Sequence, residues 1–368
     1  MVNLDFSVQL QNMMKKGDNQ AMKKLLPVLF LLAVWLMTGC ATQWTLRSEG
    51  TDKALQWPYQ PDRPKVTYVM SITGFKSDSR SLINTVVYGN SGGQDDAFRL
   101  PVAVSVGSDG RLAVADVGRK CVHLYIPGQQ KYIRLYGTDN EPLASPVGVA
   151  FDDEMKLYVS DSLAGKVFVF GNDGAFMFSF QEAGAGRLKR PTGIAYNPKD
   201  KLVYVADTLE NRIYAFNAAG KVVFSFGERG EENGRFNFPI HLFFSRAGDL
   251  YVTDTMNFRI EIFNARGGFL GVFGRHGDGS GDFAMPKGVA VDKDGIIYIV
   301  DNLFDTIQLF DRKGTFLLNV GKRGRDLGEF WLPSGLFIDD SGLLYLCDTY
   351  NARVQIFKIT EGYANGKL

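Results

Sequence analysis

An aspartate ends the same short apolar stretch six times along the chain, at Asp116, Asp161, Asp207, Asp254, Asp301 and Asp348. In three copies an arginine follows five residues later, as Arg212, Arg259 and Arg353. A carboxylate beside a base can do acid–base chemistry, but six equivalent copies are more typical of a structural unit than of a catalytic site. We therefore expect each carboxylate to accept hydrogen bonds from the amides of the following turn, and the bases to form ion pairs within or between units. Cys121 and Thr306 replace the base in the first and fifth copies, where such a pair should be missing.

A single histidine interrupts a second repeated feature. His241 stands two residues after a proline, in PIHLFF, where the other copies have Ala103, Gly148, Gly193, Gly288 and Gly335. Imidazole can bind a metal or act as a general acid or base, so His241 is a weak catalytic candidate. The chain has only three histidines, the others being His123 and His276, which favours a structural role. We predict no metal ligands and no cofactor, although a calcium site built from oxygen ligands stays open.

The elements that must position these residues repeat with a period of about 47 residues. Each unit opens at a proline, at positions Pro101, Pro146, Pro191, Pro239, Pro286 and Pro333. An apolar stretch, a polar turn, a strand ending in Asp, a third strand and a fourth strand follow each proline. The pattern predicts an all-β fold, a six-bladed β-propeller of four-stranded antiparallel blades. The sixth unit lacks a fourth strand, and residues 66–74 (VTYVMSITG) fit that pattern, so an N-terminal strand should pair with the last blade and close the ring.

These units resemble NHL repeats, whose pattern runs P-x-G-h-A-h-D, then Y-V-A-D-T-x-N-x-R-h-x-h-F, then an F-G-x-x-G loop. YVADTLENRIYAF, YVTDTMNFRIEIF and YLCDTYNARVQIF carry the resemblance, which covers residues 101–357. NHL-like propellers include binding modules, lyases and lactonase-like metalloenzymes, so the resemblance is specific for fold and weak for function. The metallo-lyases gather several histidines around the channel, which this chain cannot do. The whole chain is similar to bacterial NHL-repeat lipoproteins.

The N-terminal segment indicates export and lipid attachment. Lys23 and Lys24 precede an apolar run over 25–37, which is shorter than the roughly 20 residues of a spanning helix. The following MTGC resembles a bacterial lipobox, which makes Cys40 the expected lipidation site; an ordinary cysteine in a plain signal is the alternative, and Met22 is a possible start. We expect residues 1–39 to be an extension and signal peptide, 40–64 a lipidated tether, 65–360 the propeller and 361–368 a tail.

Three further features bear on partners. The four loops that lead into Pro191, Pro239, Pro286 and Pro333 carry nine basic and eight acidic residues, which makes a poor site for phosphate, and no nucleic acid is expected. The segment between Gly74 and Pro101 contains LINTVVYGNSGG (82–93), which we interpret either as a flap or partner-facing patch or as a loop packed on its own rim. Cys121 and Cys347 fall in neighbouring blades, where a disulfide is possible and two buried thiols are the default.

Together these features favour a monomeric, exported ring that is anchored to a bacterial membrane through Cys40, periplasmic or outer-membrane associated. We expect a non-catalytic binding or assembly platform that offers one face to an envelope protein or polymer. The alternative is a metal-dependent lyase or lactonase-like enzyme with its site at the channel mouth near His241.

Overall fold

The computed structural model describes residues 43–59, 62–63, 65–77 and 95–360. Contacts divide the chain into two compact units, and all the described strands belong to the one made of Trp44–Ser77 and Gln94–Leu368. Cys40, the 82–93 segment and the 361–368 tail lie outside the described residues. None of the helices in the described part of the chain is long and apolar enough to cross a membrane.

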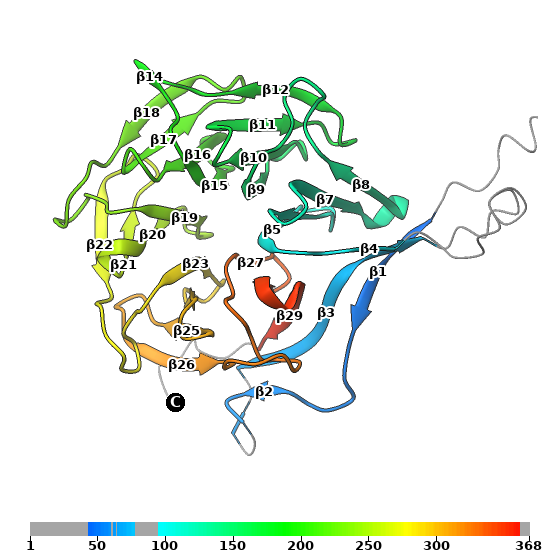
Figure 1. Ribbon diagram of the computed structural model, residues 1–368. Coiled ribbons are helices and arrows are strands. Elements are labelled where there is room, and N and C mark those ends of the chain that lie inside the picture. Colours follow the sequence, from blue (N-terminus) through cyan, green and yellow to red (C-terminus); the bar gives the residue numbers. More distant parts are fainter. Residues whose placement is uncertain (1–42, 60–61, 64, 78–94, 361–368) are drawn as a thin grey trace, which may run out of the picture. The chain divides into compact units, whose positions relative to one another are not determined.

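Six antiparallel sheets form a ring of blades, as Figure 1 shows. Blade one contains β5 (Pro101–Val106), β6 (Leu112–Asp116), β7 (Cys121–Ile126) and β8 (Lys131–Leu135). Blade two contains β9 (Pro146–Phe151), β10 (Leu157–Asp161), β11 (Lys166–Phe170) and β12 (Phe176–Phe180). Blade three contains β15 (Pro191–Asn197), β16 (Leu202–Asp207), β17 (Arg212–Phe216) and β18 (Val222–Phe226). Blades four and five contain β19 (Pro239–Phe244), β20 (Leu250–Asp254), β21 (Arg259–Phe263) and β22 (Phe269–Phe273); and β23 (Pro286–Val291), β24 (Ile297–Asp301), β25 (Thr306–Phe310) and β26 (Phe316–Val320). Short elements between them are β13 (Glu182–Ala183), β14 (Gly186–Arg187) and the 3-10 turns η1 (Pro127–Gln129), η2 (Thr255–Asn257) and η3 (Thr349–Asn351).

The sixth blade closes the ring as the sequence predicts. It joins β27 (Leu336–Ile338), β28 (Leu343–Asp348) and β29 (Arg353–Ile359) to the N-terminal β3 (Val66–Ser77), which pairs antiparallel with β29. Three more strands pair with β3, namely β1 (Trp44–Glu49), β2 (Gln56–Trp57) and β4 (Asp95–Ala97). The predicted tether over 40–64 is therefore too long, because six of its residues form β1, whose backbone hydrogen bonds cover an edge of β3 that would otherwise be free.

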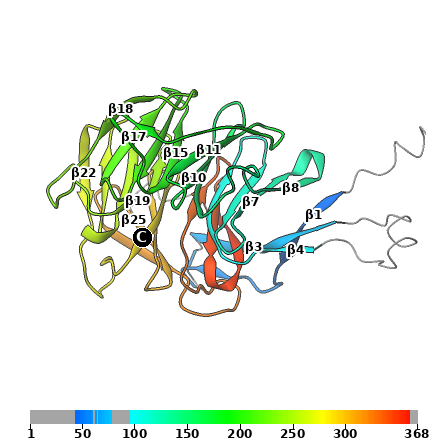
Figure 2. The ribbon, with the colours of Figure 1, turned by 45° about the horizontal axis from the view of Figure 1, so that its top comes forward.

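Strands β1, β3 and β4 lie beside blade one. The backbone N–H of Trp44 donates to the carbonyl of Gln130 at 2.8 Å, and the Trp44 ring lies 4.8 Å from that of Tyr132. Figures 1 and 2 both show the three strands side by side at this edge of the ring.

The core consists of six apolar layers, one between each pair of neighbouring blades. Second and third strands are buried on both faces because a blade covers each side, so most of their residues are apolar. Phe236, Phe283 and Phe330 in the lead-in loops are fully buried, so these three rings pack as wedges between blades and do not form a ligand cage. Gly227, Gly274 and Gly321 lie under them at positive φ, and a Cβ there would come within 2.1–2.5 Å of the ring.

The ring has two faces. The proline face carries the six prolines and the turns between second and third strands, and the mouth face is the opposite one. On the proline face, the residue after the repeated Asp links its blade to the next proline. Thr208, Thr255 and Thr349 donate Oγ1–H to the carbonyls of Pro239, Pro286 and Pro101 at 2.8–3.0 Å, and Asn302 Nδ2 donates to that of Pro333 at 2.8 Å. We call these four bonds the blade links.

Candidate functional site

The six repeated aspartates are fully buried. Each lies at the end of a second strand, and its carboxylate accepts one or two backbone N–H bonds from the lead-in segment of its own blade, at 2.6–3.1 Å. Asp116, Asp161, Asp207 and Asp301 also accept amides of the turn that follows, at 3.0–3.3 Å. A carboxylate with all its lone pairs occupied in this way holds the chain and is not offered to a substrate.

The bases divide into two groups. Each residue five after the Asp lies directly opposite it across the hairpin, but within the described ring only Arg259 and Arg353 pair with their aspartates, at 2.9 and 2.8 Å. In both blades an asparagine three after the Asp sits in a 3-10 turn and donates to the same carboxylate.

Arg212 does not pair with its aspartate, and Lys166, the base five residues after Asp161, forms its ion pair with a different acid. Arg212 donates to Ser225 Oγ at 3.3 Å and Lys166 binds Glu141 at 3.0 Å. In the third blade, which contains Arg212, the asparagine is four after the Asp, and Asn211 adopts a left-handed conformation that directs its side chain to Leu209 and Phe238. In blade five the uncharged Thr306 lies opposite Asp301, so the ion pair is missing there as expected.

The side chain seven residues after the repeated Asp binds the lead-in loop, a role that the sequence did not lead us to predict. Glu261, Gln308 and Gln355 each accept the N–H of a positive-φ glycine, namely Gly234, Gly281 and Gly328, at 2.9–3.3 Å. The constant offset from the Asp was the signal that could have found it. Burial raises the pKa of Glu261 to about 7, although Arg259 lies 2.8 Å away and opposes that shift.

His123 occupies this same position in blade one, where it joins a buried polar cluster. His123 Nδ1 lies 2.7 Å from the Tyr132 hydroxyl, and its Nε2 lies 3.5 Å from Asp116 and 3.7 Å from Cys121 Sγ. The Tyr132 hydroxyl donates to Asp96, which Arg134 pairs at 2.7 Å. Burial and the carboxylate of Asp96 raise the pKa of Tyr132, so the phenol stays protonated and donates.

Cys121 and Cys347 are both buried and free, so the disulfide considered from the sequence is not formed between these two described residues. Burial, with the charge of Asp116, raises the pKa of Cys121 to about 12. Burial also raises the pKa of Cys347. Both thiols therefore stay protonated and unreactive at neutral pH.

His241 is a spacer between blades four and five. Where other blades have glycine, the inner strands touch directly: a Cβ at Gly193 would come within 2.7 Å of the His241 Cα, and one at Gly288 within 2.7 Å of the Ser334 carbonyl. The imidazole of His241 fills the wider gap, and its Nδ1 accepts the N–H of Val289 at 3.3 Å. Burial lowers the pKa of His241 to about 4, although part of the ring is accessible from the channel. The ring is thus neutral at pH 7, with Nδ1 engaged.

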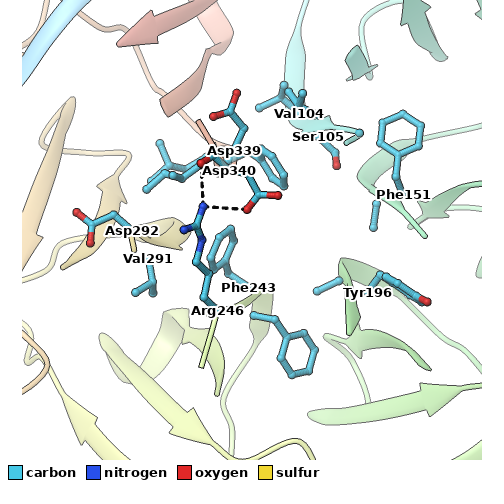
Figure 3. Close-up of a pocket in the computed structure, with 18 of the residues that line it drawn as sticks. Val104, Ser105, Phe151, Tyr196, Phe243, Arg246, Val291, Asp292, Asp339 and Asp340 are labelled. Carbon is cyan, nitrogen blue, oxygen red and sulfur yellow. Dashed lines mark hydrogen bonds and ion pairs between the residues drawn. The ribbon is translucent and has the colours of Figure 1, made fainter. Parts of the chain in front are cut away.

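A cavity of about 760 Å³ opens on the mouth face, at the end of the central channel (Figure 3). Every blade contributes apolar side chains to its wall, among them Val104, Val149, Ile194, Phe243, Val291 and Leu336. The rings of Phe151 and Tyr196 lie further out. Arg246 of blade four donates to the carbonyl and carboxylate of Asp340 in blade six, at 2.8 and 3.0 Å, and so bridges part of the rim. A ligand of this cavity would meet apolar side chains from every blade together with charged ones such as Arg246, Asp292 and Asp339.

The donor set of this cavity does not fit a metal. Asp292 and Asp339 line it, but their carboxylate oxygens are already occupied. In each, one oxygen accepts two amides of its own turn and the other accepts a tyrosine hydroxyl. His241 has one nitrogen engaged. In the described part of the chain, no three His, Cys, Asp or Glu side chains group closely enough to hold an ion. A catalytic zinc site takes three protein ligands and calcium six to eight oxygens.

Comparisons with known proteins agree with this architecture. A family model described as a 6-bladed beta-propeller matches residues 239–307, and an NHL repeat model matches residues 330–357. A comparison of the sequence with curated proteins finds no match.

Solved structures with a similar fold include a streptogramin B lyase (TM-score 0.56, 12% identity, 86% of this chain and 98% of the other) and a gluconolactonase from Xanthomonas campestris (TM-score 0.57, 15% identity, 85% and 99%). Hydrazine synthase from Kuenenia stuttgartiensis is also similar (TM-score 0.53, 17% identity, 71% and 77%). Identities this low carry the fold and not the activity. The chain is thus a six-bladed β-propeller that contains an NHL repeat at residues 330–357.

Proposed function

We propose that this protein is an exported, lipid-anchored binding platform of the bacterial envelope, and that its mouth-face cavity takes an apolar segment of a partner protein. The observation that carries the proposal is the wall of the cavity. All six blades supply aliphatic or aromatic side chains to it, and the one imidazole beside them is engaged with Val289.

The size of the cavity fits this role. Ligand pockets of about 300–1,000 Å³ accommodate drug-sized apolar groups, and 760 Å³ lies within that range. A sugar-acid or lactone substrate would require several polar groups that converge on the reacting atoms. Of the acids that line this cavity, Asp292 and Asp339 are instead committed to their own turns, and Asp340 pairs with Arg246.

A photo-cross-linking experiment in intact cells tests the platform. A photoreactive phenylalanine analogue replaces Phe243 in the cavity wall or, as the matched control, Phe269 on the exposed outer strand β22. We expect one discrete protein adduct from position 243 and none from 269, and loss of the adduct when Phe337→Asp places a charge in the cavity. Equal labelling at both positions, or no adduct at either, would contradict the proposal.

Two further experiments test the lipid anchor and the enzyme alternative. Cys40→Ser should move the protein from the membrane fraction to the soluble fraction and abolish incorporation of labelled palmitate. Elemental analysis of the full chain, purified without chelator, addresses the enzyme alternative: about one zinc or calcium per chain would favour it over the platform.

A further inference from the structure

Five blades present a large apolar side chain to solvent at the same position. The residue two after the repeated Asp forms the tip of the turn between the second and third strands. These tips are Leu163, Leu209, Met256, Leu303 and Tyr350, with exposed fractions of 72%, 47%, 42%, 57% and 54%. We call them the crown residues. Blade one has Gly118 at this position.

We propose that the crown residues form a membrane-contact surface, so that the proline face of the ring rests on a phospholipid bilayer. Single exposed apolar residues are common on proteins, but equivalent ones in five of six blades are not scattered. The turn itself does not need them, since the backbone N–H groups of Leu163, Leu209 and Leu303 make the bonds to the Asp carboxylates.

The arrangement of the tips favours a flat partner. All five tips lie on the proline face, because each turn is tied through its Asp to the lead-in segment of its own blade. A planar surface can therefore contact every tip at once, with each side chain inserted separately into the interfacial layer.

The loops between the tips argue against a protein partner. The four that lead into Pro191, Pro239, Pro286 and Pro333 carry nine basic and eight acidic residues, whereas the core of a protein–protein interface is continuous and depleted of charge. A headgroup layer is itself charged and hydrated, so it accepts such loops beside inserted apolar tips.

Blade six adds interfacial side chains to the crown. The rings of Trp331 and Tyr350 lie 5.7 Å apart, and the guanidinium of Arg325 lies 4.7 Å from the Trp331 ring centre. Trp and Tyr concentrate at membrane–water interfaces, and arginine keeps its charge among the headgroups while its stem contacts apolar surface.

The lipid anchor would hold the chain at the bilayer while the crown makes its contact. This step rests on the proposed function, which places the lipid on Cys40.

Site-specific labels on the full lipidated chain test the orientation. Leu163→Cys and Leu303→Cys each receive an environment-sensitive fluorophore, with Ala219→Cys in an exposed mouth-face turn as the control. The native thiols do not compete, since Cys121 and Cys347 are buried. On phosphatidylethanolamine–phosphatidylglycerol vesicles, we expect iodide quenching to fall at least fivefold at 163 and 303 and to stay unchanged at 219. Equal quenching at all three positions would overturn the proposal.

Matched variants measure the contribution of the crown. The change Leu163→Ser, Leu209→Ser, Met256→Ser and Leu303→Ser should speed transfer of the protein between vesicles at least tenfold. The control change Met177→Ser, Val223→Ser, Leu270→Ser and Val272→Ser removes four exposed apolar residues from outer strands and should alter the rate less than twofold. Similar rates for the two variants would count against the crown.

The outcomes separate the two proposals. If the wild-type chain does not bind vesicles, the lipid anchor fails. If it binds but the labels at 163 and 303 stay accessible to iodide, the anchor stands and the crown fails. Shielding that appears only when native envelope proteins are added would identify a protein occupant and overturn the membrane contact.

Discussion

Blades six and one are neighbours in the ring, yet they hold the same buried carboxylate by different means. In blade six, Asp348 pairs with Arg353 at 2.8 Å and also accepts the side-chain amides of Asn351 and Gln355, both at 2.9 Å. In blade one, Asp116 accepts three backbone amides and has His123 Nε2 at 3.5 Å.

The side-chain partners of the two carboxylates differ because the segments that lead into the two blades differ. Blade six is preceded by a loop, and Arg353 and Gln355 bind its carbonyls of Asp326 and Glu329 at 2.7–2.9 Å. Blade one is preceded by β4, whose Asp96 is held by Tyr132 and Arg134. The carboxylate is thus constant, while its side-chain partners vary with the connection that they must fix.

The largest expected effect is on blade six. Asp348→Ala leaves the Arg353 guanidinium buried without its partner, which costs about 3–5 kcal/mol of unfolding free energy. Asp116→Ala removes hydrogen bonds to amides and the contact with the His123 imidazole but leaves no guanidinium without its carboxylate, at a cost of about 1–3 kcal/mol. Urea unfolding of both variants measures the difference, and equal losses would show that the arginine does not distinguish the blades.

The next largest loss of unfolding free energy is expected in the buried polar cluster of blade one. Tyr132→Phe removes the hydroxyl between His123 and Asp96 and should cost about 1–3 kcal/mol, because two buried polar groups lose a partner. Tyr196→Phe is the control, since its hydroxyl binds Asp153 at an exposed site and should cost under about 0.5 kcal/mol. If urea unfolds both variants at the same midpoint, the hydroxyl of Tyr132 has no structural role in the cluster.

Glu261→Gln makes blade four resemble blades five and six, which already have glutamine at this position. The folded-state pKa of Glu261, about 7, lies above its ordinary 4.5, so the folded protein holds an extra proton between these values. The stability from this proton is present below pH 4.5 and is lost as pH rises to about 7. The variant should lose this pH dependence and gain about 1–2 kcal/mol at pH 8. A constant difference in unfolding free energy between the two proteins from pH 4.5 to 8, measured in urea, would refute this expectation.

The smallest effect concerns the link between the two blades. Thr349→Val removes the bond to the carbonyl of Pro101, at a cost of about 1 kcal/mol. Thr255→Val removes the equivalent link between blades four and five and serves as the reference. If β3 alone secures the ring closure, thermal unfolding will show a smaller loss for the Thr349 variant than for the reference.

The sequence predicted the ring because its period, its prolines and its missing fourth strand are local patterns. A structural role for the six aspartates was predictable because six equivalent copies argue against catalysis. Their hydrogen bonds to backbone amides agree with that role. The pairing of Arg212 failed because a one-residue shift of asparagine changes the turn, which spacing alone does not show. The cavity and the Arg246–Asp340 bridge join residues of different blades, and no sequence pattern connects those.

The blade links have a consequence for how the ring opens. Four of the six steps around the proline face carry one, including the step from blade six to blade one, where the chain's two ends meet. Blade one has Val117, which has no side-chain donor, and the Ser162 hydroxyl of blade two turns to Ser145 within its own blade. The Ser160 hydroxyl of blade two donates instead to the carbonyl of Thr192 in blade three, so within the described ring the step from blade one to blade two is the one without a side-chain link on the proline face. Local opening should therefore begin at that step, away from the terminal closure. Amide hydrogen exchange would be fastest at this seam, and a partner that spans it would slow it.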